Sequence, residues 1–283
     1  MIRVLVTGAC GPAGRSLLDQ LSARGVTAVG CDMMPEPRAD GIEVLGVLPA
    51  RDPGYLQDLD QLVLAQNATL LIPTVQEELP IVAEDPPFQA LISSEETIRI
   101  CDDKWLTGQH LAAAGVPVPA TVRAESALPA DIAPLGLPVL SKPRVSRGGR
   151  GVELHDQLNT IPKEQGVLLS EFAPGTEYCV QMLRGLGQDL CVVLEKTALR
   201  EGRVGNADAV RRVEVPDVAE VATAACEALG IRGPADLDIR RRDDGTPLVI
   251  EVNARFGAQS AHAPEIIDAV LAWHVARRAA AEV

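Results

Sequence analysis

One face of a predicted β-hairpin near the end of the chain collects oxygen-bearing side chains. Residues 243–246, Asp-Asp-Gly-Thr, separate two apolar runs, and an Asp-Gly pair in that setting favours a two-residue turn. With Asp243 opposite Thr246, alternation places four polar side chains on one face, in the pairs Asp238 with Glu251 and Asp236 with Asn253. The other face receives the apolar side chains Leu237, Ile239, Ile250 and Val252, with Ile239 opposite Ile250.

Carboxylates gathered in this way repel one another, and a bound cation would remove the repulsion. A few carboxylates and an amide, completed by substrate phosphates, supply the oxygen ligands that Mg²⁺ prefers. Arg255 follows Asn253 by two residues on the same face and adds a positive charge. The cluster therefore predicts a magnesium site, with a solvated polar face as the alternative.

A glycine-rich turn with cations precedes this hairpin in the sequence. Lys142 ends an apolar run that begins at Leu137, and residues 146–151 follow as Ser-Arg-Gly-Gly-Arg-Gly. The N–H groups and cations of such a turn can fold over phosphates, although an ordinary basic surface turn has the same composition. The chain contains no G-x-x-x-x-G-K-[ST] pattern, so no P-loop competes for this role. We expect residues 144–151 to be mobile without nucleotide and ordered by ATP.

A second glycine-rich turn lies near the N-terminus. Gly8, Gly11 and Gly14 stand between a predicted strand and a predicted helix, where N–H groups can approach an anion. Asp32 ends the next strand and could hold a ribose hydroxyl of a dinucleotide. Glycine is also favoured at any tight strand-to-helix turn. Neither tyrosine of the chain has the lysine four residues later that a short-chain oxidoreductase or epimerase would carry.

Two kinds of structure must position these groups. The first hundred residues predict an open parallel α/β sheet, with strands at 2–7, 26–31 and 70–73 and helices at 15–24 and 56–65. A helix from Asp102 or Asp103 to Gly115 follows. The rest predicts short strands at 137–142, 167–172, 177–183, 190–197, 237–241 and 248–253, with helices at 218–229 and 264–278.

Composition restricts the possible partners. Of the 283 residues, 47% are hydrophobic, and no run approaches the roughly 18 apolar residues of a membrane helix. The N-terminus enters a strand directly and shows no export signal, and the six cysteines are scattered and expected to be reduced, so we expect a cytoplasmic protein. A formal charge of −13 disfavours nucleic acid and anionic membranes as partners.

Together these segments resemble the ATP-grasp superfamily, most closely its carbamoyl-phosphate-synthase-like branch, over nearly the whole chain. Four ordered motifs carry the resemblance: Cys-Asp-Asp-Lys at 101–104 with Gly-Val-Pro-Val-Pro at 115–119, Leu-Ser-Lys-Pro at 140–143 with the glycine-rich turn, Ser-Glu-Phe-Ala-Pro-Gly-Thr-Glu-Tyr at 170–178, and Glu-Val-Asn-Ala-Arg-Phe-Gly at 251–257. The family often has Pro where Ala254 stands and can have Gln where Asp238 stands. Neither difference removes an oxygen ligand.

The resemblance implies a role for each motif. Lys104 and Lys142 would neutralise ATP phosphates, Glu171 and Ala173 would meet the adenine edge, and Glu177 would meet the ribose. The full ATP-binding set is Lys104, Lys142, Gly148, Gly149, Gly151, Glu171, Phe172, Ala173 and Glu177. Asp238, Glu251 and Asn253 would hold one or two Mg²⁺ ions, with Mn²⁺ as a substitute. Arg255 and Lys142 would be catalytic, and Thr74 and Glu77, in the loop at 73–78, would face substrate.

The implied fold is α/β, and α+β in its C-terminal half. A Rossmann-like pre-ATP-grasp domain would occupy residues 1–100, an ATP-grasp small lobe with a glycine-rich lid 101–175, and a large lobe with the metal-binding hairpin 176–283. The implied activity is an ATP- and Mg²⁺-dependent carboxylate-amine ligase that forms an acyl phosphate, with an amino acid among the candidate acids. Its partners would be a small carboxylate and a nucleophile, and a homodimer is allowed. The alternatives are an NAD(P)-dependent oxidoreductase or epimerase and a non-catalytic nucleotide-binding protein.

Overall fold

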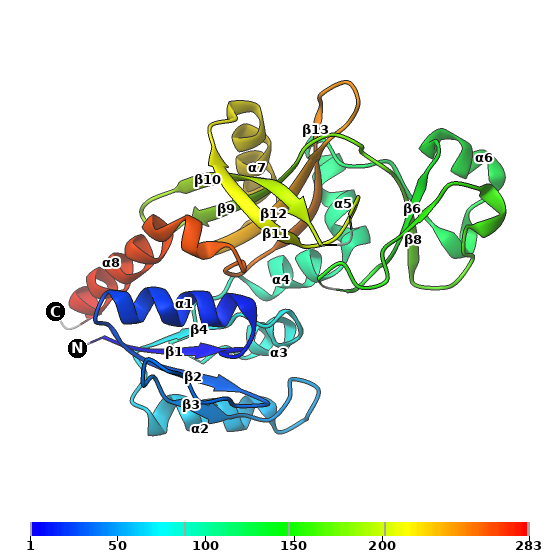
Figure 1. Cartoon of the computed structure of the whole chain (residues 1–283). Coiled ribbons are helices and arrows are strands. Elements are labelled where there is room, and N and C mark those ends of the chain that lie inside the picture. Colours follow the sequence, from blue (N-terminus) through cyan, green and yellow to red (C-terminus); the bar gives the residue numbers. More distant parts are fainter. Residues whose placement is uncertain (1, 88, 147, 201, 282–283) are drawn as a thin grey trace.

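Three sheets build the protein in a computed structural model that describes residues 2–87, 89–146, 148–200 and 202–281 (Figure 1). The fold is mixed α/β, as the sequence predicts. The first sheet is parallel, in the order β3-β2-β1-β4, and its strands are β1 (Arg3–Thr7), β2 (Thr27–Asp32), β3 (Val44–Gly46) and β4 (Leu70–Ile72). Within the described residues, no helix is both long enough and apolar enough to span a bilayer.

Helices α1 (Pro12–Ala23) and α2 (Tyr55–Ala65) cover opposite faces of this sheet (Figure 1). The reason is the alternation of side chains along a strand. In β1, Val4 and Val6 pack in one core with the leucines of α1, whereas Leu5 packs in another core with Tyr55 and Leu59 of α2. Because these strands are parallel, the ends that carry Thr7, Asp32 and Gly46 meet at one edge of the sheet, where the loops to the next elements begin.

The second sheet is antiparallel, in the order β11-β10-β9-β12-β13. Its strands are β9 (Glu177–Arg184), β10 (Leu190–Leu199), β11 (Ala207–Val213), β12 (Gly233–Arg241) and β13 (Pro247–Asn253). Helix α7 (Pro216–Ala228) packs on one face, together with α3 (Leu79–Glu84), α4 (Glu95–Asp102) and α5 (Lys104–Ala113). Neither β11 nor α4 was predicted from the sequence.

The third sheet forms a small lobe with its own core. Its order is β5-β8-β6-β7, with β5 (Thr121–Arg123), β6 (Val139–Pro143), β7 (Glu153–His155) and β8 (Val167–Glu171). Helix α6 (Pro129–Ile132) lies beside this sheet (Figure 1). The hydrophobic core of the lobe includes Ala124, Leu135, Val139, Ile161 and Leu169.

The hairpin of β12 and β13 corrects the predicted turn. The Arg242 N–H donates to the Thr246 carbonyl at 2.9 Å, so three residues form the loop and the predicted two-residue turn is wrong. Gly245 at φ +88° accounts for this, because a left-handed third position is typical of three-residue hairpin loops. Ile239 consequently pairs with Val249 and not with Ile250.

A β-bulge at Ile250 then restores the predicted register. Beyond it, Asp238 lies opposite Glu251 and Asp236 opposite Asn253, so the pairing of the polar residues is confirmed. A bulge leaves one residue of its strand unpaired and turns the strand locally. Val249 therefore takes the core position predicted for Ile250, which lines a cavity instead.

The first and second sheets share a core. Val4 and Leu17 of the N-terminal part lie in the same buried cluster as Leu194 of β10 and Ile267 of helix α8 (Pro264–Ala281). Figure 1 shows α8 beside α1, and the Arg24 guanidinium joins them by contacting Asp268 at 2.6 Å. The N-terminal part and the C-terminal part are therefore joined by a shared core and an ion pair. The domain limits at residues 100 and 175 stay a prediction.

Candidate functional site

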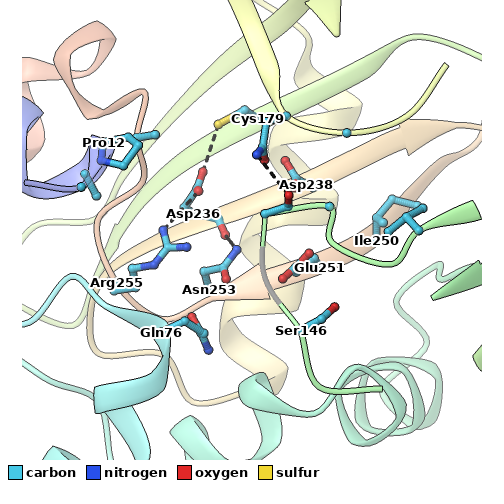
Figure 2. Close-up of a pocket in the computed structure, with 18 of the residues that line it drawn as sticks. Pro12, Gln76, Ser146, Cys179, Asp236, Asp238, Ile250, Glu251, Asn253 and Arg255 are labelled. Carbon is cyan, nitrogen blue, oxygen red and sulfur yellow. Dashed lines mark hydrogen bonds and ion pairs between the residues drawn. The ribbon is translucent and has the colours of Figure 1, made fainter. Parts of the chain in front are cut away.

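A cavity of about 590 Å³ lies where the three sheets meet. The loops after the parallel strands form one end of it, and β6 and β8 of the small lobe line another side. The faces of β9, β10, β12 and β13 supply further charged groups, among them Glu177, Lys196, Asp238 and Glu251. Figure 2 shows Pro12 and Gln76 on elements of the N-terminal part, across from Asp236, Glu251 and Arg255 on the hairpin side.

Each of the three carboxylates on the polar face of the hairpin has a cationic partner. The Lys196 ammonium lies 2.7 Å from Asp238, and that of Lys104 lies 3.3 Å from Glu251. Asp236 accepts hydrogen bonds from Gln181, at 2.6 Å, and from the Cys179 thiol, and it pairs with Arg255 at 3.4 Å. Cations from other elements therefore lie among these carboxylates and offset the repulsion expected between them.

The predicted metal residues keep a donor set that suits Mg²⁺. Asp238 and Glu251 are cross-strand partners, and Asn253 follows on the same strand as Glu251 and lines the same cavity. Two carboxylates and an amide are hard oxygen ligands, which Mg²⁺ takes together with substrate phosphates. Among the side chains that the structure describes, no group of three or more His, Cys, Asp or Glu is arranged to hold an ion without such help.

Lys142 reaches the cavity from β6. Its side chain is buried, and its ammonium donates to the Ile250 carbonyl at 3.5 Å, at the bulge. Burial is the main cause that lowers the pKa of Lys142 to about 8; the positive charge of Lys104 acts in the same direction, and the carboxylates of Glu251 and Asp238 oppose it. An anionic phosphate would complete the compensation of this charge.

Lys196 and Arg240 were missed by the sequence analysis. Both contact Glu177, the predicted ribose ligand, at 2.6 Å and 3.2 Å. Burial lowers the pKa of Lys196, but Asp238 and Glu177 outweigh that effect and the pKa is raised. The one available signal was a lysine inside the otherwise largely apolar run of β10.

The segment at Glu171, Phe172 and Ala173 lines the cavity between β8 and β9. The Glu171 carboxylate pairs with Arg242 at 2.8 Å and accepts from the Ala120 N–H at 3.2 Å. The Phe172 ring lies 4.6 Å and 4.7 Å from the guanidinium groups of two arginines, Arg203 and Arg240. Ala173 is buried.

The glycine-rich turn is held at its base by Lys104, and its tip contacts the loop between β10 and β11. Lys104 donates from its ammonium to the Ser146 carbonyl at 2.5 Å, and Asn206 donates to the Gly148 carbonyl at 3.2 Å. Gly148 and Gly149 line the cavity, whereas the α-carbon of Gly151 faces the Pro143 ring. Arg147 lies outside the described residues.

A buried carboxylate holds the predicted substrate loop in place. Glu78 accepts hydrogen bonds from the side chains of Thr7 and Tyr55 and, at 2.9 Å each, from the N–H groups of Thr74 and Val75. Burial raises the pKa of this carboxyl. The Thr74 hydroxyl donates to the Thr7 carbonyl at 2.7 Å, so it is tied to the protein.

Gln76 and Glu77 are the other members of that loop. Both line the cavity, as Thr74 does; Gln76 was predicted only as a member of the loop at 73–78. The Gln76 amide nitrogen donates to Asp102 at 3.1 Å, while its oxygen is buried without a described partner. That oxygen is therefore a candidate acceptor for a substrate donor.

The N-terminal glycine turn has a structural explanation. A side chain at Gly14 would start 2.2 Å from the Gly8 carbonyl oxygen, so only glycine fits there. The two carboxylate oxygens of Asp32 accept from the Cys10 and Met34 N–H groups, at 3.0 Å each. Asp32 therefore holds the two loops at this edge of the sheet.

Comparison with known proteins gives a family match over more than half of the chain. The profile of the family described as ATP-grasp domain matches residues 101–259. A D-alanine–D-alanine ligase of Gloeobacter violaceus is 28% identical over 195 residues, which are 60% of this chain and 64% of that protein. An uncharacterized protein of Sinorhizobium fredii is 29% identical over 189 residues, 57% of this chain and 37% of its own length. The chain thus matches less than two thirds of either curated relative.

Solved structures show the same fold at low sequence identity. An L-amino acid ligase from Bacillus licheniformis superimposes with a TM-score of 0.69 and 20% identity, over 92% of this chain and 68% of that one. An N5-carboxyaminoimidazole ribonucleotide synthetase from Thermotoga maritima gives a TM-score of 0.66 and 20% identity, over 90% and 69%. At such identities the likeness concerns the arrangement of the elements.

Proposed function

The chain belongs to the ATP-grasp domain family, and from this premise we propose that it is an ATP- and Mg²⁺-dependent carboxylate-amine ligase. A carboxylate oxygen would attack the γ-phosphorus of ATP, the bond from that phosphorus to the β–γ bridging oxygen would break, and ADP would leave. An amine would then attack the acyl carbon, lose a proton and release inorganic phosphate. The amide bond formed is the product.

One observation carries this proposal. Three lysines and an arginine, namely Lys104, Lys142, Lys196 and Arg255, converge with the hairpin carboxylates in one cavity beneath a glycine-rich turn. Catalysis of phosphoryl transfer rests on positioning and on compensating charge that spreads over the phosphoryl oxygens. A cavity that holds both cations and Mg²⁺-compatible oxygen ligands supplies those two requirements.

The charged side chains of the cavity would have three roles: contacting the phosphates, stabilising the transferred phosphoryl group and holding Mg²⁺. Lys104 and Lys142 would contact the phosphates, and the protonated Lys142 would gain most because burial leaves its charge poorly compensated. Arg255, paired with Asp236 on the hairpin face, would stabilise the transferring phosphoryl group and the acyl phosphate. Asp238, Glu251 and Asn253 would hold Mg²⁺, which when bound neutralises the β- and γ-phosphates.

The remaining site residues would orient the nucleotide. Glu171, Phe172 and Ala173 line the cavity as one segment and would contact the adenine, while Gly148 and Gly149 would cover the phosphates. Glu177 would meet the ribose, with Lys196 and Arg240 fixing its carboxylate.

The acid proposed for this site is an amino acid. The support is chemical and comes from the Gln76 oxygen, which is buried without a described partner on a loop that Glu78 holds rigidly. An ammonium group would supply the missing donor. The printed names of two similar proteins, a D-alanine–D-alanine ligase and an L-amino acid ligase, agree with this choice.

The decisive experiment measures ADP formation with Mg²⁺ and pools of amino acids, with and without hydroxylamine. Hydroxylamine converts an acyl phosphate to a hydroxamate, so hydroxamate that depends on ATP and on one acid supports the proposal. Lys142→Met should abolish it. Binding of NAD or NADP at micromolar concentration, with no binding of ATP, would overturn the proposal in favour of an oxidoreductase.

A further inference from the structure

The N-terminal end of the cavity differs chemically from the hairpin end. The apolar side chains that line it include Pro12, Ala13, Met33, Val47, Leu48 and Val75. We call this set the apolar end. All six follow strands of the parallel sheet, at the edge where the carboxyl ends of the strands meet.

Two of these side chains are unusually exposed for their type. Met33 is 64% exposed and Leu48 is 39% exposed. Large apolar side chains on the rim of a functional cavity commonly mark a surface that a ligand covers.

The loops that carry them are held in place by backbone hydrogen bonds. The Leu48 N–H donates to the Asp58 carboxylate at 2.8 Å, and the Val47 N–H donates to the Asp32 carbonyl at 3.1 Å. The Asp32 carboxylate fixes the segment around Met33 by accepting from the Met34 N–H. The apolar side chains are therefore presented by an ordered edge.

The charges at this end offer no cation to a phosphate-rich ligand. Among the described residues that line the cavity, none from the first hundred is basic, whereas Asp32, Glu77 and Glu78 are acidic. A dinucleotide on the glycine turn would bring its pyrophosphate to a place without a cation, beside carboxylates.

We propose that the apolar end binds an apolar group carried by one of the two small substrates, either the acid or the nucleophile. The inference rests on the proposed ligase function and makes it narrower, since it selects substrates with aliphatic or thioether side chains over small polar ones. The continuity of this end with the phosphate-handling end places such a group next to the reacting carboxylate.

The test compares Met33→Asp with Met34→Asp. Met34 is the neighbouring residue, is 71% exposed and is absent from the cavity lining, so the two variants carry the same change of charge on similarly exposed positions. The probes are L-leucine and L-methionine against glycine and L-serine, each with MgATP. Met33→Asp should raise KM for the apolar probes about tenfold or more, while Met34→Asp should stay within about twofold.

Two arms identify which substrate carries the apolar group. With hydroxylamine as the only nucleophile, an effect of Met33→Asp on hydroxamate formation assigns the group to the acid. An effect seen only when the acid is fixed and the amine varied assigns it to the nucleophile. Equal effects of both variants, or a wild type that prefers glycine and serine, would overturn the inference.

A binding measurement separates this inference from the ligase proposal. Saturation-transfer NMR with L-leucine and 4-methylpentanoate reports contact at the methyl groups whether or not turnover occurs. If the wild type forms no ADP with any probe, the ligase proposal fails. The apolar-end inference is still supported if the wild type and Met34→Asp show methyl saturation and Met33→Asp does not. The apolar-end inference is overturned if the wild type shows no methyl saturation. It is also overturned if the wild type binds NAD and Met33→Asp loses that binding.

Discussion

Individual charges in the cavity are compensated by partners from distant parts of the sequence. Glu251 pairs with Lys104, 147 residues earlier, and Asp238 with Lys196 from a different strand. Removing one member of a largely buried pair leaves the other without compensation, and that usually costs more than the pair itself contributes. Changes at these residues should therefore affect both stability and turnover.

Glu251→Gln should lower ADP formation by about two to four orders of magnitude, because a proposed Mg²⁺ ligand loses its charge. It should also lower the free energy of unfolding by about 1–2 kcal/mol, since Lys104 loses its partner and Lys142 loses a nearby negative charge. ATPase assays and urea unfolding measure the two effects. Glu195→Gln is the control, because Glu195 pairs with an exposed arginine and should cost less than about 0.5 kcal/mol. Near-normal activity would refute the metal assignment.

Lys142 should make stability depend on pH in a defined direction. Its pKa in the folded protein is about 8 and its ordinary value is 10.5, so between these values the unfolded chain binds a proton that the folded chain lacks. Stability therefore rises with pH across this window. Relative to Lys142→Met, the wild type should gain about 3 kcal/mol between pH 7.5 and 10.5.

Urea unfolding at several pH values checks this prediction. Lys163→Met is the control, because that lysine is exposed and its removal should give no comparable gain. A wild type that loses stability relative to Lys142→Met over the same range would contradict the sign.

The sequence was sufficient for part of the site. Alternation along each strand predicted which side chains share the polar face, whereas the predicted pairing of Asp238 with Glu251 holds because the bulge at Ile250 offsets the longer turn. The partner lysine Lys196 and the arginine Arg240 could not be predicted, because their contacts depend on which non-adjacent strands lie side by side. The buried Gln76 oxygen could not be predicted either, since burial of a loop residue depends on the whole fold.

Among the elements, the strongest periodic segments were predictable and the irregular ones were not. The predicted helix at 218–229 corresponds to α7, and the strand at 177–183 corresponds to β9. The edge strand β11 was missed, because its sequence, Ala-Asp-Ala-Val-Arg-Arg-Val, alternates poorly. The bulge at Ile250 has no local signal, since it compensates for a turn one residue longer than expected.

The glycine-rich turn gives a prediction at this scale. Gly149 has φ +69°, and a Cβ there would lie 3.3 Å from the Gly205 α-carbon. Gly149→Ala should therefore move the tip of the glycine-rich turn away from Gly205 and raise KM for ATP about five- to tenfold. Gly187→Ala is the control, with φ +85°, open space around it and no place in the cavity lining. Equal KM values for the two variants would show that the turn takes no part in nucleotide binding.

The molecule as a whole is joined by a core that crosses from the N-terminal sheet to the C-terminal helix. Ile267 of α8 is fully buried in the cluster that contains Val4 and Leu17. The N-terminal part therefore depends on residues from the far end of the chain for its packing. Sequence patterns give the faces of each element but not this long-range partnership.

Ile267→Ala should lower the free energy of unfolding by about 2–4 kcal/mol, through lost burial and the cavity left behind. The N-terminal and C-terminal parts should lose stability together. Hydrogen exchange should therefore show a similar decrease in amide protection in both parts. Val275→Ala on the same helix is the control, because Val275 is exposed and its change should cost less than about 0.5 kcal/mol. Unfolding of the C-terminal part alone would show that the shared core does not couple the two parts.

The cations of the cavity lie inside a molecule whose formal charge is −13. From a distance an approaching MgATP, itself an anion, meets net repulsion, and it meets attraction only within the cavity. Salt screens the long-range repulsion over a Debye length of about 10 Å at 0.1 M. The association rate constant should therefore increase as ionic strength rises from low values, opposite to the slowing seen for electrostatically steered ligands. Stopped-flow mixing with a fluorescent ATP analogue at 10 and 150 mM salt measures the direction, and a rate that falls with salt would place the field of the cavity cations beyond its mouth.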